Sequence, residues 1–426
     1  MRVQAGAAAS RPADALAILQ MGSHLPPFVG QGHDVGMNSQ FLEFQQVPSG
    51  PTFSAPPTPT ISSSGAPGHQ FVAEERTMHR ERSGSANAAD DDRGLTLRLA
   101  AERWASRNGF SPEQMTEFGH LMGMVCSTYI AKGKLSGLKE IDSGSFGKIY
   151  STTYDGVPVA VKQISNKPGD ATIKSKMREL LLELRVLVRV RHPNVVTFWG
   201  TATEFPSDNH SQPYIGLVFE LCEKKSLHSA LFESQQRLKP SQKLKIAHQT
   251  ALGLAYLHSK RVIHRDINPR NILLTAECTA KIADFGCARV LSGSATSLKT
   301  TTISGSPAYM APEQLQGNEL TECVDTWAFA IMLWEIMMDQ KPWEGRFPDF
   351  NSLKSAIVNG EKLIMPADHR PYPPCYVNMI KLGMQYKPHD RPSMTYIEGE
   401  LGSAVVQFKH NLKREREKLD REGGAC

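Results

Sequence analysis

The spacing of apolar residues changes along the chain and predicts several successive segments. Residues 1 to about 94 have no periodic apolar pattern, and the run from Pro48 to Gly68 is dominated by Pro, Ser, Thr, Gly and Ala. Such a composition cannot bury enough apolar surface to offset the loss of chain entropy on folding. We therefore expect a disordered, Pro/Ser-rich region over residues 1–94, with order beginning near Leu95.

A helical pattern follows this region. Ser111 can cap a helix that has Pro112 at its first position and Gln114 at its third. We interpret the apolar face of this helix as a surface that packs against the following domain rather than as a separate binding site, and we assign residues 95–133 to a helical extension. The residues at helical spacing on this face are Met115, Phe118, Met122, Val125, Cys126 and Tyr129.

Strand patterns begin near Lys134. The segments Leu138 to Ser143 and Lys148 to Tyr154 flank a glycine-rich turn. Asp155-Gly156 is a strong hairpin signal before a third strand from Val157 to Ile164. Three strands joined by short turns are therefore expected.

The later segments are mainly helical. A long helical pattern covers Ile173 to Val190, and strand patterns then continue to about Cys222. This order of elements predicts an α+β fold with two lobes, a small β-rich N-lobe and a larger helical C-lobe. In the C-lobe, Ser241 can cap a helix whose apolar side carries Leu244, Ala247, Ala251, Leu254 and Leu257.

Composition and charge exclude several classes of protein. The chain has 426 residues, of which 40% are apolar and 21% charged, an ordinary composition for a globular protein with a core. A net charge of +5 is small for this length and does not indicate nucleic acid or a membrane surface as a partner. The seven cysteines include no pair at metal-ligand spacing, which fits a reducing compartment.

The apolar segments predict neither a secretory signal nor a membrane span. Arg11 and Asp14 interrupt the apolar residues near the N-terminus. The longest apolar stretch, Trp327 to Met338, contains Glu335 and is too short to cross a bilayer. We therefore expect a cytoplasmic or nuclear protein without a membrane partner.

Candidate catalytic and metal-binding residues lie in two segments of the C-lobe. Asp266 and Asn271 are five residues apart, so a carboxylate can meet a substrate hydroxyl while the carboxamide holds a metal ion. Asp284 follows an apolar strand pattern, with Phe285 placed to pack beneath it. Carboxylate and amide oxygens of the kind that Asp284 and Asn271 offer are suited to magnesium.

A candidate phosphate-binding pattern lies in the predicted N-lobe. The glycines of Gly144-Ser145-Phe146-Gly147 sit between two strands, where a backbone without Cβ atoms can approach phosphate, although such glycines are also ordinary turn residues. Lys162 ends an apolar strand segment and is either a phosphate contact or a surface lysine. A phosphate-binding Lys needs an anionic partner, and we prefer Glu183 to Glu179, which is one helical turn earlier.

In this order and spacing, these segments resemble the eukaryotic protein kinase family over about residues 134–405. We therefore expect a kinase domain with the bilobal protein kinase fold over these residues and a charged C-terminal tail at 406–426. Further matches to the family are Ala311-Pro312-Glu313 and Asp325 to Phe329. Two more, Leu333-Trp334-Glu335 and Arg391 to Met394, are most similar to the tyrosine-kinase-like group, which includes mixed-lineage and Raf-like serine/threonine kinases.

The resemblance implies ATP and Mg²⁺ as cofactors and proteins as substrates. It implies that Asp266 accepts the proton of the substrate hydroxyl, and that Asn271 and Asp284 bind magnesium. Lys162 would contact the α- and β-phosphates of ATP and pair with Glu183. The other residues implied to contact ATP are Ile141, Gly144, Ser145, Phe146, Gly147 and Ile149 around the phosphate loop, Ala160 and Leu273 on either side of the adenine, and Glu220 and Cys222 of the hinge.

The resemblance also implies structural roles. Phe219 would be the bulky residue that precedes the hinge, at the gatekeeper position. Glu313 and Arg391 would form a buried ion pair. The residues implied to stack in the regulatory spine are Leu187, His264 and Phe285.

Some positions depart from the family pattern. Asn268 stands where serine/threonine kinases usually have Lys, which removes a positive charge beside the transferred phosphoryl group. Asp142 stands in place of the first glycine of the phosphate loop. Arg270 resembles tyrosine kinases, whereas Gly305 to Tyr309 resembles the substrate-binding loop of serine/threonine kinases, in which Ser306 could bond the catalytic Asp.

The leading functional hypothesis is an active serine/threonine kinase of signal transduction. Phosphorylation between Gly286 and Ala311 would regulate it, with Thr300 to Thr302 as the preferred sites and Arg265 as the phosphate's partner. The alternatives are a weakly active kinase or pseudokinase that acts as a signalling scaffold, and a dual-specificity or tyrosine kinase. Pro56-Pro57-Thr58-Pro59 is a candidate docking motif for protein partners, with a solvated tail as the alternative.

Overall fold

The computed structural model describes residues 87–144, 147–164, 173–206, 213–291, 293–299 and 304–423. The predicted disordered region therefore lies outside the described residues, except for its last few positions. These positions belong to helix α1, Asn87–Arg107, which begins ahead of the expected start of order near Leu95.

Two helices precede the strands. After α1, the helix α2, Pro112–Ser127, begins with the predicted cap. The backbone N–H of Gln114 donates to Ser111 Oγ at 3.3 Å, and that of Ser111 donates to Gln114 Oε1 at 2.9 Å. Tyr129 lies in strand β1 and not on the helix, because α2 ends at Ser127, so its assignment to the apolar face was wrong. The buried residues of this face are Phe118, Leu121, Met122 and Val125.

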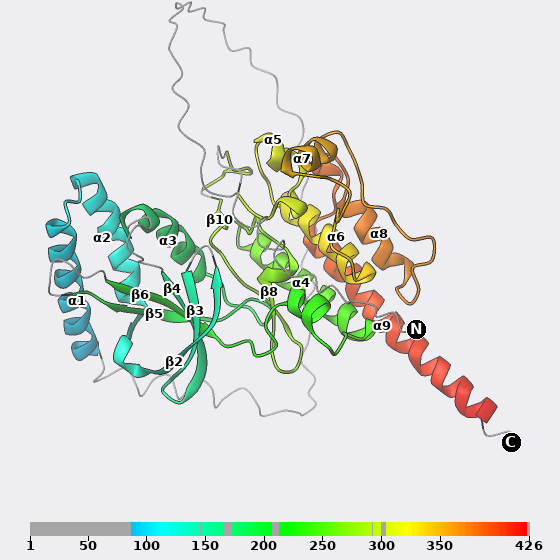
Figure 1. The fold of residues 1–426 in the computed structure, drawn as a ribbon, viewed down its shortest axis with the longest axis horizontal. Helices are drawn as coiled ribbons and strands as arrows, with labels where there is room; N and C mark the ends of the chain where they lie inside the picture. Colours follow the sequence, from blue (N-terminus) through cyan, green and yellow to red (C-terminus); the bar gives the residue numbers. More distant parts are fainter. Residues whose placement is uncertain are drawn as a thin grey trace, which may run out of the picture. The chain divides into compact units, whose positions relative to one another are not determined.

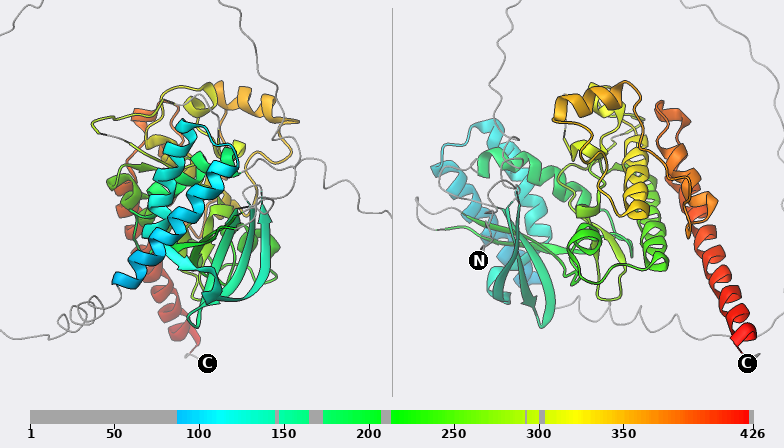
Figure 2. Two further views of the ribbon diagram at one scale, coloured as in Figure 1. Left: turned by 90° about the vertical axis from the view of Figure 1, so that its left-hand side faces the viewer. Right: turned by 45° about the vertical axis from the view of Figure 1, so that its right-hand side comes forward.

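The N-lobe is built on a sheet whose described part has six strands in the order β1-β5-β6-β4-β3-β2. All neighbours are antiparallel except β1, which pairs in parallel with β5. Helix α3, Ile173–Leu187, covers the sheet beside α2 (Figures 1 and 2). The strands are β1 Tyr129–Ala131, β2 Leu135–Gly144, β3 Gly147–Tyr154, β4 Val157–Ile164, β5 Phe198–Glu204 and β6 Tyr214–Glu220.

The C-lobe is mainly helical and confirms the predicted α+β, two-lobed fold (Figure 1). It also contains two short antiparallel pairs, β7 with β10 and β8 with β9, of which β7 and β9 contact α4. The helices are α4 Pro240–Ser259, α5 Pro312–Gln316, α6 Cys323–Met338, α7 Phe350–Val358, α8 Pro374–Gly383 and α9 Met394–Gly423, and the strands are β7 Val262–Ile263, β8 Ile272–Leu274, β9 Ala280–Ile282 and β10 Arg289–Val290.

Two features of the C-lobe differ from expectation. Helix α4 begins at Pro240, and the N–H of Lys239 donates to Gln242 Oε1 at 2.9 Å. Ser241 therefore lies in the first turn and does not cap the helix, because the proline sets the start two residues earlier than a Ser241 cap would. Helix α9 runs without a break past residue 405, so the charged residues that follow continue a helix that packs on α4 and α8.

The apolar helix α6 runs through the centre of the C-lobe. Its residues from Val324 to Ile336 are all buried, which explains the apolar stretch seen in the sequence. None of the helices within the described residues is long and apolar enough to cross a membrane.

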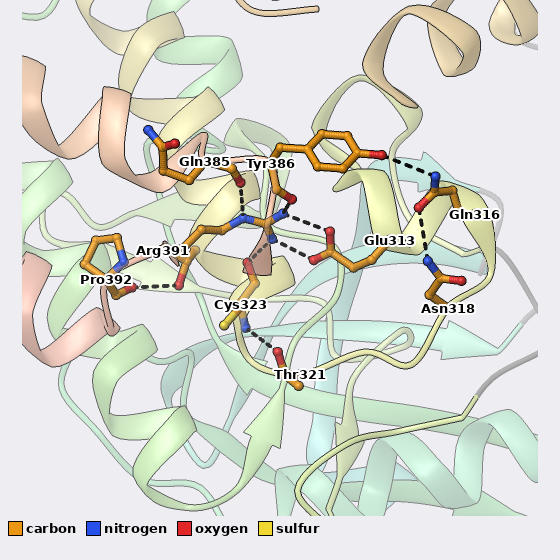
Figure 3. A network of polar contacts seen from close by, with 10 residues as sticks. Glu313, Gln316, Asn318, Thr321, Cys323, Gln385, Tyr386, Arg391 and Pro392 are labelled. Atoms are coloured by element: carbon orange, nitrogen blue, oxygen red, sulfur yellow. Dashed lines mark hydrogen bonds and ion pairs between the residues drawn. The ribbon is translucent and has the colours of Figure 1, made fainter. Parts of the chain in front are cut away.

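A buried ion pair joins α5 to the segment before α9 (Figure 3). Arg391 Nη1 and Nη2 donate to the two carboxylate oxygens of Glu313 at 2.6 and 2.8 Å. The remaining guanidinium hydrogens go to the backbone oxygens of Gln385, Tyr386 and Cys323, at 2.7, 3.0 and 2.9 Å. All five donors of Arg391 are therefore used, and the predicted pair is present.

We expect Arg391→Met to lower the free energy of unfolding by about 3–5 kcal/mol, since it leaves the Glu313 carboxylate buried and unpaired. Urea unfolding would measure the change. Arg98→Met is the control, because Arg98 pairs with Glu102 at 3.0 Å on an exposed helix face, where a pair contributes at most about 1 kcal/mol. Equal losses in the two variants would contradict the structural role of Arg391.

Candidate active site

The loop that carries Asp266 is hydrogen-bonded to the buried carboxylate of Asp325 in α6. Asp325 Oδ1 accepts the N–H of Arg265 at 2.7 Å, and its Oδ2 accepts the N–H of His264 at 2.8 Å. His258 Nε2 lies 3.0 Å from the same Oδ2. Burial alone would raise the pKa of Asp325, but these hydrogen bonds outweigh it and the pKa is lowered. An ionised carboxylate thus fixes two consecutive backbone amides before Asp266.

The Asp266 carboxylate is itself held by three donors. Its Oδ1 accepts the N–H of Ser306 at 2.8 Å and Nδ2 of Asn268 at 3.0 Å. Its Oδ2 accepts Nδ2 of Asn271 at 2.9 Å, and the same amide also donates to the Asp266 carbonyl oxygen at 2.8 Å. The orientation of this carboxylate is therefore set by its neighbours.

Asn268 has a structural role that the sequence did not suggest. It is almost fully buried, and its Nδ2 also donates to Ser306 Oγ at 3.2 Å. Its Oδ1 accepts the N–H of Arg270 at 2.9 Å and so caps the short helix Pro269–Asn271. The Arg270 guanidinium contacts His228 Nε2 at 3.0 Å. Asn268 thus connects the catalytic loop to the loop that contains Ser306.

Ser306 contacts Asp266, but through a different group than the predicted hydroxyl. Its backbone N–H, and not its hydroxyl, bonds Asp266, while the hydroxyl accepts from Asn268. The preceding Gly305 has φ 116°, and a Cβ there would lie 2.7 Å from the Arg265 carbonyl oxygen. Only glycine fits this approach, a requirement that sequence reasoning missed.

Lys162 on β4 lies between two carboxylates. Its Nζ is 2.8 Å from Glu183 Oε1 on α3 and 3.0 Å from Asp284 Oδ1, which follows β9. Glu179, the alternative partner, is exposed, so the preference for Glu183 agrees with this geometry. Burial alone would lower the pKa of Lys162, but the attraction of Glu183 and then of Asp284 outweighs it and raises that pKa. Burial alone would raise the pKa of Asp284, but the attraction of Lys162 outweighs it and lowers that pKa. Both groups are therefore charged.

The phosphate loop is described only at its two ends. Gly144 and Gly147 face each other across the end of the β2–β3 hairpin, while Ser145 and Phe146 lie outside the described residues. Gly147 has φ 140°, in the region that favours glycine. Asp142, which replaces the usual first glycine, is exposed and its Oδ1 accepts the N–H of Ser143 at 2.8 Å.

The other residues expected to contact ATP come from both lobes. Ile149 pairs with Lys162 across β3 and β4, and Ala160 pairs with Phe219 across β4 and β6. Leu273 is partly buried on β8 in the C-lobe. Ile141 is 45% exposed, next to an irregularity in the pairing of β2 with β3.

The two hinge residues have different surroundings. The Glu220 carboxylate accepts from Thr197 N–H at 2.6 Å and from Lys281 Nζ at 2.8 Å, so only its backbone would serve a nucleotide. Burial, with the nearby Glu220 carboxylate, raises the pKa of the Cys222 thiol to about 12, so the thiol is neutral.

The stacked core behind the site agrees with the expected spine. The rings of His264 and Phe285 have centroids 5.2 Å apart in an edge-to-face arrangement. His264 Nε2 lies 3.1 Å from the Ala283 carbonyl oxygen, and Leu187 on α3 is buried in the same apolar cluster. This packing supports the backbone immediately before Asp284.

Asn271 and Asp284 fit a magnesium ion by the chemistry of their oxygens. The Asn271 amide donates through Nδ2 to Asp266, which directs its Oδ1 away from that carboxylate. Asp284 stays ionised beside Lys162. No group of three or more His, Cys, Asp or Glu side chains within the described residues could hold a metal alone. The carboxylate and amide oxygens of Asp284 and Asn271 are of the kind that magnesium prefers, and magnesium is commonly bound by one or two protein oxygens together with substrate phosphates.

The segment after Asp284 lies against Arg265. Arg265 Nη2 donates to Ser304 Oγ at 2.7 Å, and its Nε donates to the Cys287 carbonyl oxygen at 2.8 Å. Burial and the neighbouring Arg289 guanidinium lower the pKa of Arg265, so two cationic groups lie close together. The candidate phosphorylation sites Thr300 to Thr302 lie outside the described residues.

A further buried carboxylate, Glu335, lies near the site and was not anticipated. Tyr309 OH donates to Glu335 Oε2 at 2.5 Å, from the short helix Pro307–Tyr309 to α6. Burial raises the pKa of Glu335 to about 7 despite this hydrogen bond. The signal available in the sequence is a single acid within the apolar stretch Trp327 to Met338, where it argues against a membrane span.

These two lobes, the Lys162–Glu183–Asp284 contacts and the loop around Asp266 define a protein kinase domain. The chain belongs to the family described as protein tyrosine and serine/threonine kinase, which matches residues 135–401.

Curated relatives agree with this family and with the predicted tyrosine-kinase-like group. The chain is 32% identical to serine/threonine-protein kinase CTR1 of Arabidopsis thaliana, over 48% of the chain and 24% of that protein. It is 30% identical to the probable serine/threonine-protein kinase drkD of Dictyostelium discoideum, over 64% of the chain and 20% of that protein. Dual specificity protein kinase shkB of the same organism is 28% identical, over 61% of the chain and 38% of that protein.

The similarity to these proteins is confined to part of each. The chain covers between 14% and 44% of the length of eight curated relatives that it matches.

We expect Glu335→Gln to change the dependence of stability on pH. Because the folded pKa of about 7 is above the ordinary value of 4.5, the folded state holds a proton that the unfolded state has lost between these pH values. Wild-type stability should therefore fall as the pH rises from 4.5 to 7, relative to the variant, by up to about 3 kcal/mol.

Urea unfolding of both proteins at pH 5 and pH 8 would measure this difference. Glu113→Gln, at an exposed position of α2, controls for the loss of one negative charge. A Glu335→Gln effect that is the same at the two pH values would contradict the raised pKa.

Proposed function

We propose that this chain is an ATP- and magnesium-dependent protein kinase that transfers the γ-phosphate of ATP to serine or threonine of protein substrates. The observation that carries the proposal is the position of Lys162 between Glu183 and Asp284, because it joins β4, α3 and the segment after β9 around one cation. A kinase needs this Lys and this Asp in place at the same time.

The Asp266 carboxylate would accept the proton of the substrate hydroxyl. As the hydroxyl oxygen bonds to the γ-phosphorus, the bond from that phosphorus to the β–γ bridging oxygen breaks and ADP leaves. The three donors that hold Asp266 fix the direction of its lone pairs, so the acceptor is oriented before the substrate arrives. The enzyme's contribution is then mostly positioning and charge stabilisation.

The charge of the phosphates would be balanced from both lobes. Lys162, kept protonated by its two carboxylate neighbours, would donate to the α- and β-phosphates. Asn271 and Asp284 would hold magnesium, which when bound neutralises charge on the phosphate oxygens. The backbone at Gly144 and Gly147 would cover the phosphates, while Ala160 and Leu273 enclose the adenine.

We expect Asp266→Asn to lower phosphate transfer from labelled ATP by about 100-fold or more, since the variant removes the proton acceptor. Asp155→Asn is the matched control, because it makes the same change at an exposed hairpin turn where Asn followed by Gly is favoured. Equal transfer by the wild type and the Asp266 variant would refute the enzyme proposal.

The choice of acceptor residue is a finer part of the proposal. Serine or threonine is favoured by the loop from Gly305 to Tyr309 and by the names of most relatives. A dual-specificity or tyrosine kinase is the alternative, which Arg270 and the dual-specificity relative support. Phosphoamino-acid analysis of the product distinguishes these two.

A weakly active kinase or pseudokinase that signals as a scaffold is the second candidate function, and Asn268 is the observation that favours it. Because Asn268 holds both Asp266 and Ser306, we expect Asn268→Ala to lower kcat by up to about 100-fold with little change in the KM for ATP.

Asn268→Lys, measured in the same steady-state assay, separates the two functions. A gain in kcat with Lys would favour the weakly active kinase, because it would show that the native loop lacks a needed charge. A lower or unchanged kcat with Lys, together with the loss in Asn268→Ala, would support an active enzyme that uses Asn268 for positioning.

Regulation and partners complete the proposal. A phosphate between Gly286 and Ala311, with Thr300 to Thr302 as the preferred sites, would meet the Arg265 guanidinium, which has the Arg289 guanidinium beside it. The proline-rich motif around Thr58 would dock protein partners in a signalling pathway of the cytoplasm or nucleus.

A further inference from the structure

The helices α1 and α2 precede the part of the chain that matches the kinase family, yet they are built into the N-lobe. The family match begins at residue 135, whereas α2 and β1 end before it. Helix α2 packs along α1 on one side and along α3 on another, and both contacts are extensive (Figure 2). Helix α3 carries Glu183, so α2 lies directly against the element that reaches Lys162.

The burial of α3 shows that it is covered from more than one side. A helix that lies on a single layer buries roughly three to four residues in two turns. In α3, seven of the eleven residues from Met177 to Leu187 are buried, which is more than one layer accounts for. These residues are Met177, Leu180, Leu181, Glu183, Leu184, Val186 and Leu187.

The C-terminal end of α2 is fixed to the edge of the sheet. The N–H of Thr201 on β5 donates to the Thr128 carbonyl oxygen at 2.7 Å, and the two threonine hydroxyls are 3.1 Å apart. Strand β1 then continues beside β5 in parallel. Gly200 allows this approach, because a Cβ at that position would collide with the Thr128 carbonyl oxygen.

An aromatic cluster fixes the other side of the helix pair. Phe118 of α2 is fully buried, and its ring centroid lies 5.4 Å from that of Phe110, 6.4 Å from Trp104 of α1 and 6.2 Å from Phe205, which follows β5. Such contacts between aromatic rings add stability beyond the area that they bury. Helix α2 is therefore held to β5 at its C-terminal end and, through Phe118 near its middle, to Phe205 just after β5, while it packs against α3.

We propose that α1 and α2 form a positioning element for catalysis, which holds α3 at the distance from the sheet at which Glu183 bonds Lys162. The element is anchored to β5 through Thr128 and to the segment just after β5 through Phe118. Because β5 is joined through β6 to β4, which carries Lys162, this anchor fixes the distance between α3 and Lys162. It acts through Glu183 and touches neither ATP nor substrate. The effect on catalysis rests on the proposed kinase activity, whereas the effect on α3 does not.

The test is a buried truncation in α2 of the full-length chain, compared with an equal truncation elsewhere. Leu121→Ala removes a fully buried side chain of α2, and Leu401→Ala removes a fully buried one of α9 in the C-lobe. Both should lower thermal stability, since each leaves a cavity. Val125→Ala is a milder change on the same face of α2, for the case that Leu121→Ala fails to fold.

Two quantities distinguish positioning from general stability. We expect Leu121→Ala to speed amide hydrogen exchange in α3 by about 10-fold or more, which reports local opening, and to raise the KM for ATP while lowering kcat. Val125→Ala should shift both in the same direction by less. Leu401→Ala should leave α3 exchange and the KM for ATP at wild-type values.

Unchanged α3 exchange in both α2 variants, or an equal change in Leu401→Ala, would overturn the proposal. Hydrogen exchange separates its failure from that of the proposed function. If the wild type transfers no phosphate, the kinase proposal fails, and the exchange rates of α3 still decide whether α2 holds it.

Discussion

The ammonium group of Lys162 is the point on which the arrangement of the two lobes depends. A buried cation is strongly unfavourable unless carboxylates compensate for its lost hydration. Here Glu183 and Asp284 do so, at 2.8 and 3.0 Å. The two carboxylates belong to different elements, α3 and the segment after β9, so the electrostatic requirement of one side chain brings together an N-lobe helix and a C-lobe loop. Displacement of either element would leave a charge buried without its partner.

In the C-lobe, hydrogen bonds rather than an ion pair with Lys hold the carboxylates of the site in place. Asp325 and Asp266 are both carboxylates whose oxygens are directed by N–H groups of neighbouring segments. Asn268 has a place in this network because a carboxamide can donate and accept at once, which an ammonium group cannot. It bonds Asp266, Ser306 and the Arg270 amide together. With Asn in place of the usual Lys, the chain loses a flexible positive charge at this position and gains hydrogen bonds that join the catalytic loop to the loop of Ser306.

Much of the fold and site could be predicted from local signals in the sequence. The Ser111 cap, the hairpin at Asp155-Gly156 and the preference for Glu183 depend on short-range spacing, and the structure agrees with each of them. The parts that were missed depend on contacts between distant segments. The fit of Gly305 against Arg265 and the bond from Tyr309 to Glu335 join residues that no periodicity relates. The expectation that Ser241 caps α4 was wrong because Pro240 starts the helix and leaves Ser241 in its first turn.

Strand β1 has a consequence for how this domain can be isolated. Its three residues pair with Thr201, Ala202 and Thr203 and so cover one side of β5. A recombinant fragment that began at the family boundary, residue 135, would leave that side of β5 unpaired and would remove the helices from the ring of Phe205. An unpaired strand next to exposed aromatic surface is a template for self-association. The boundary that preserves solubility therefore lies before α1, about fifty residues upstream of the boundary that similarity alone would suggest.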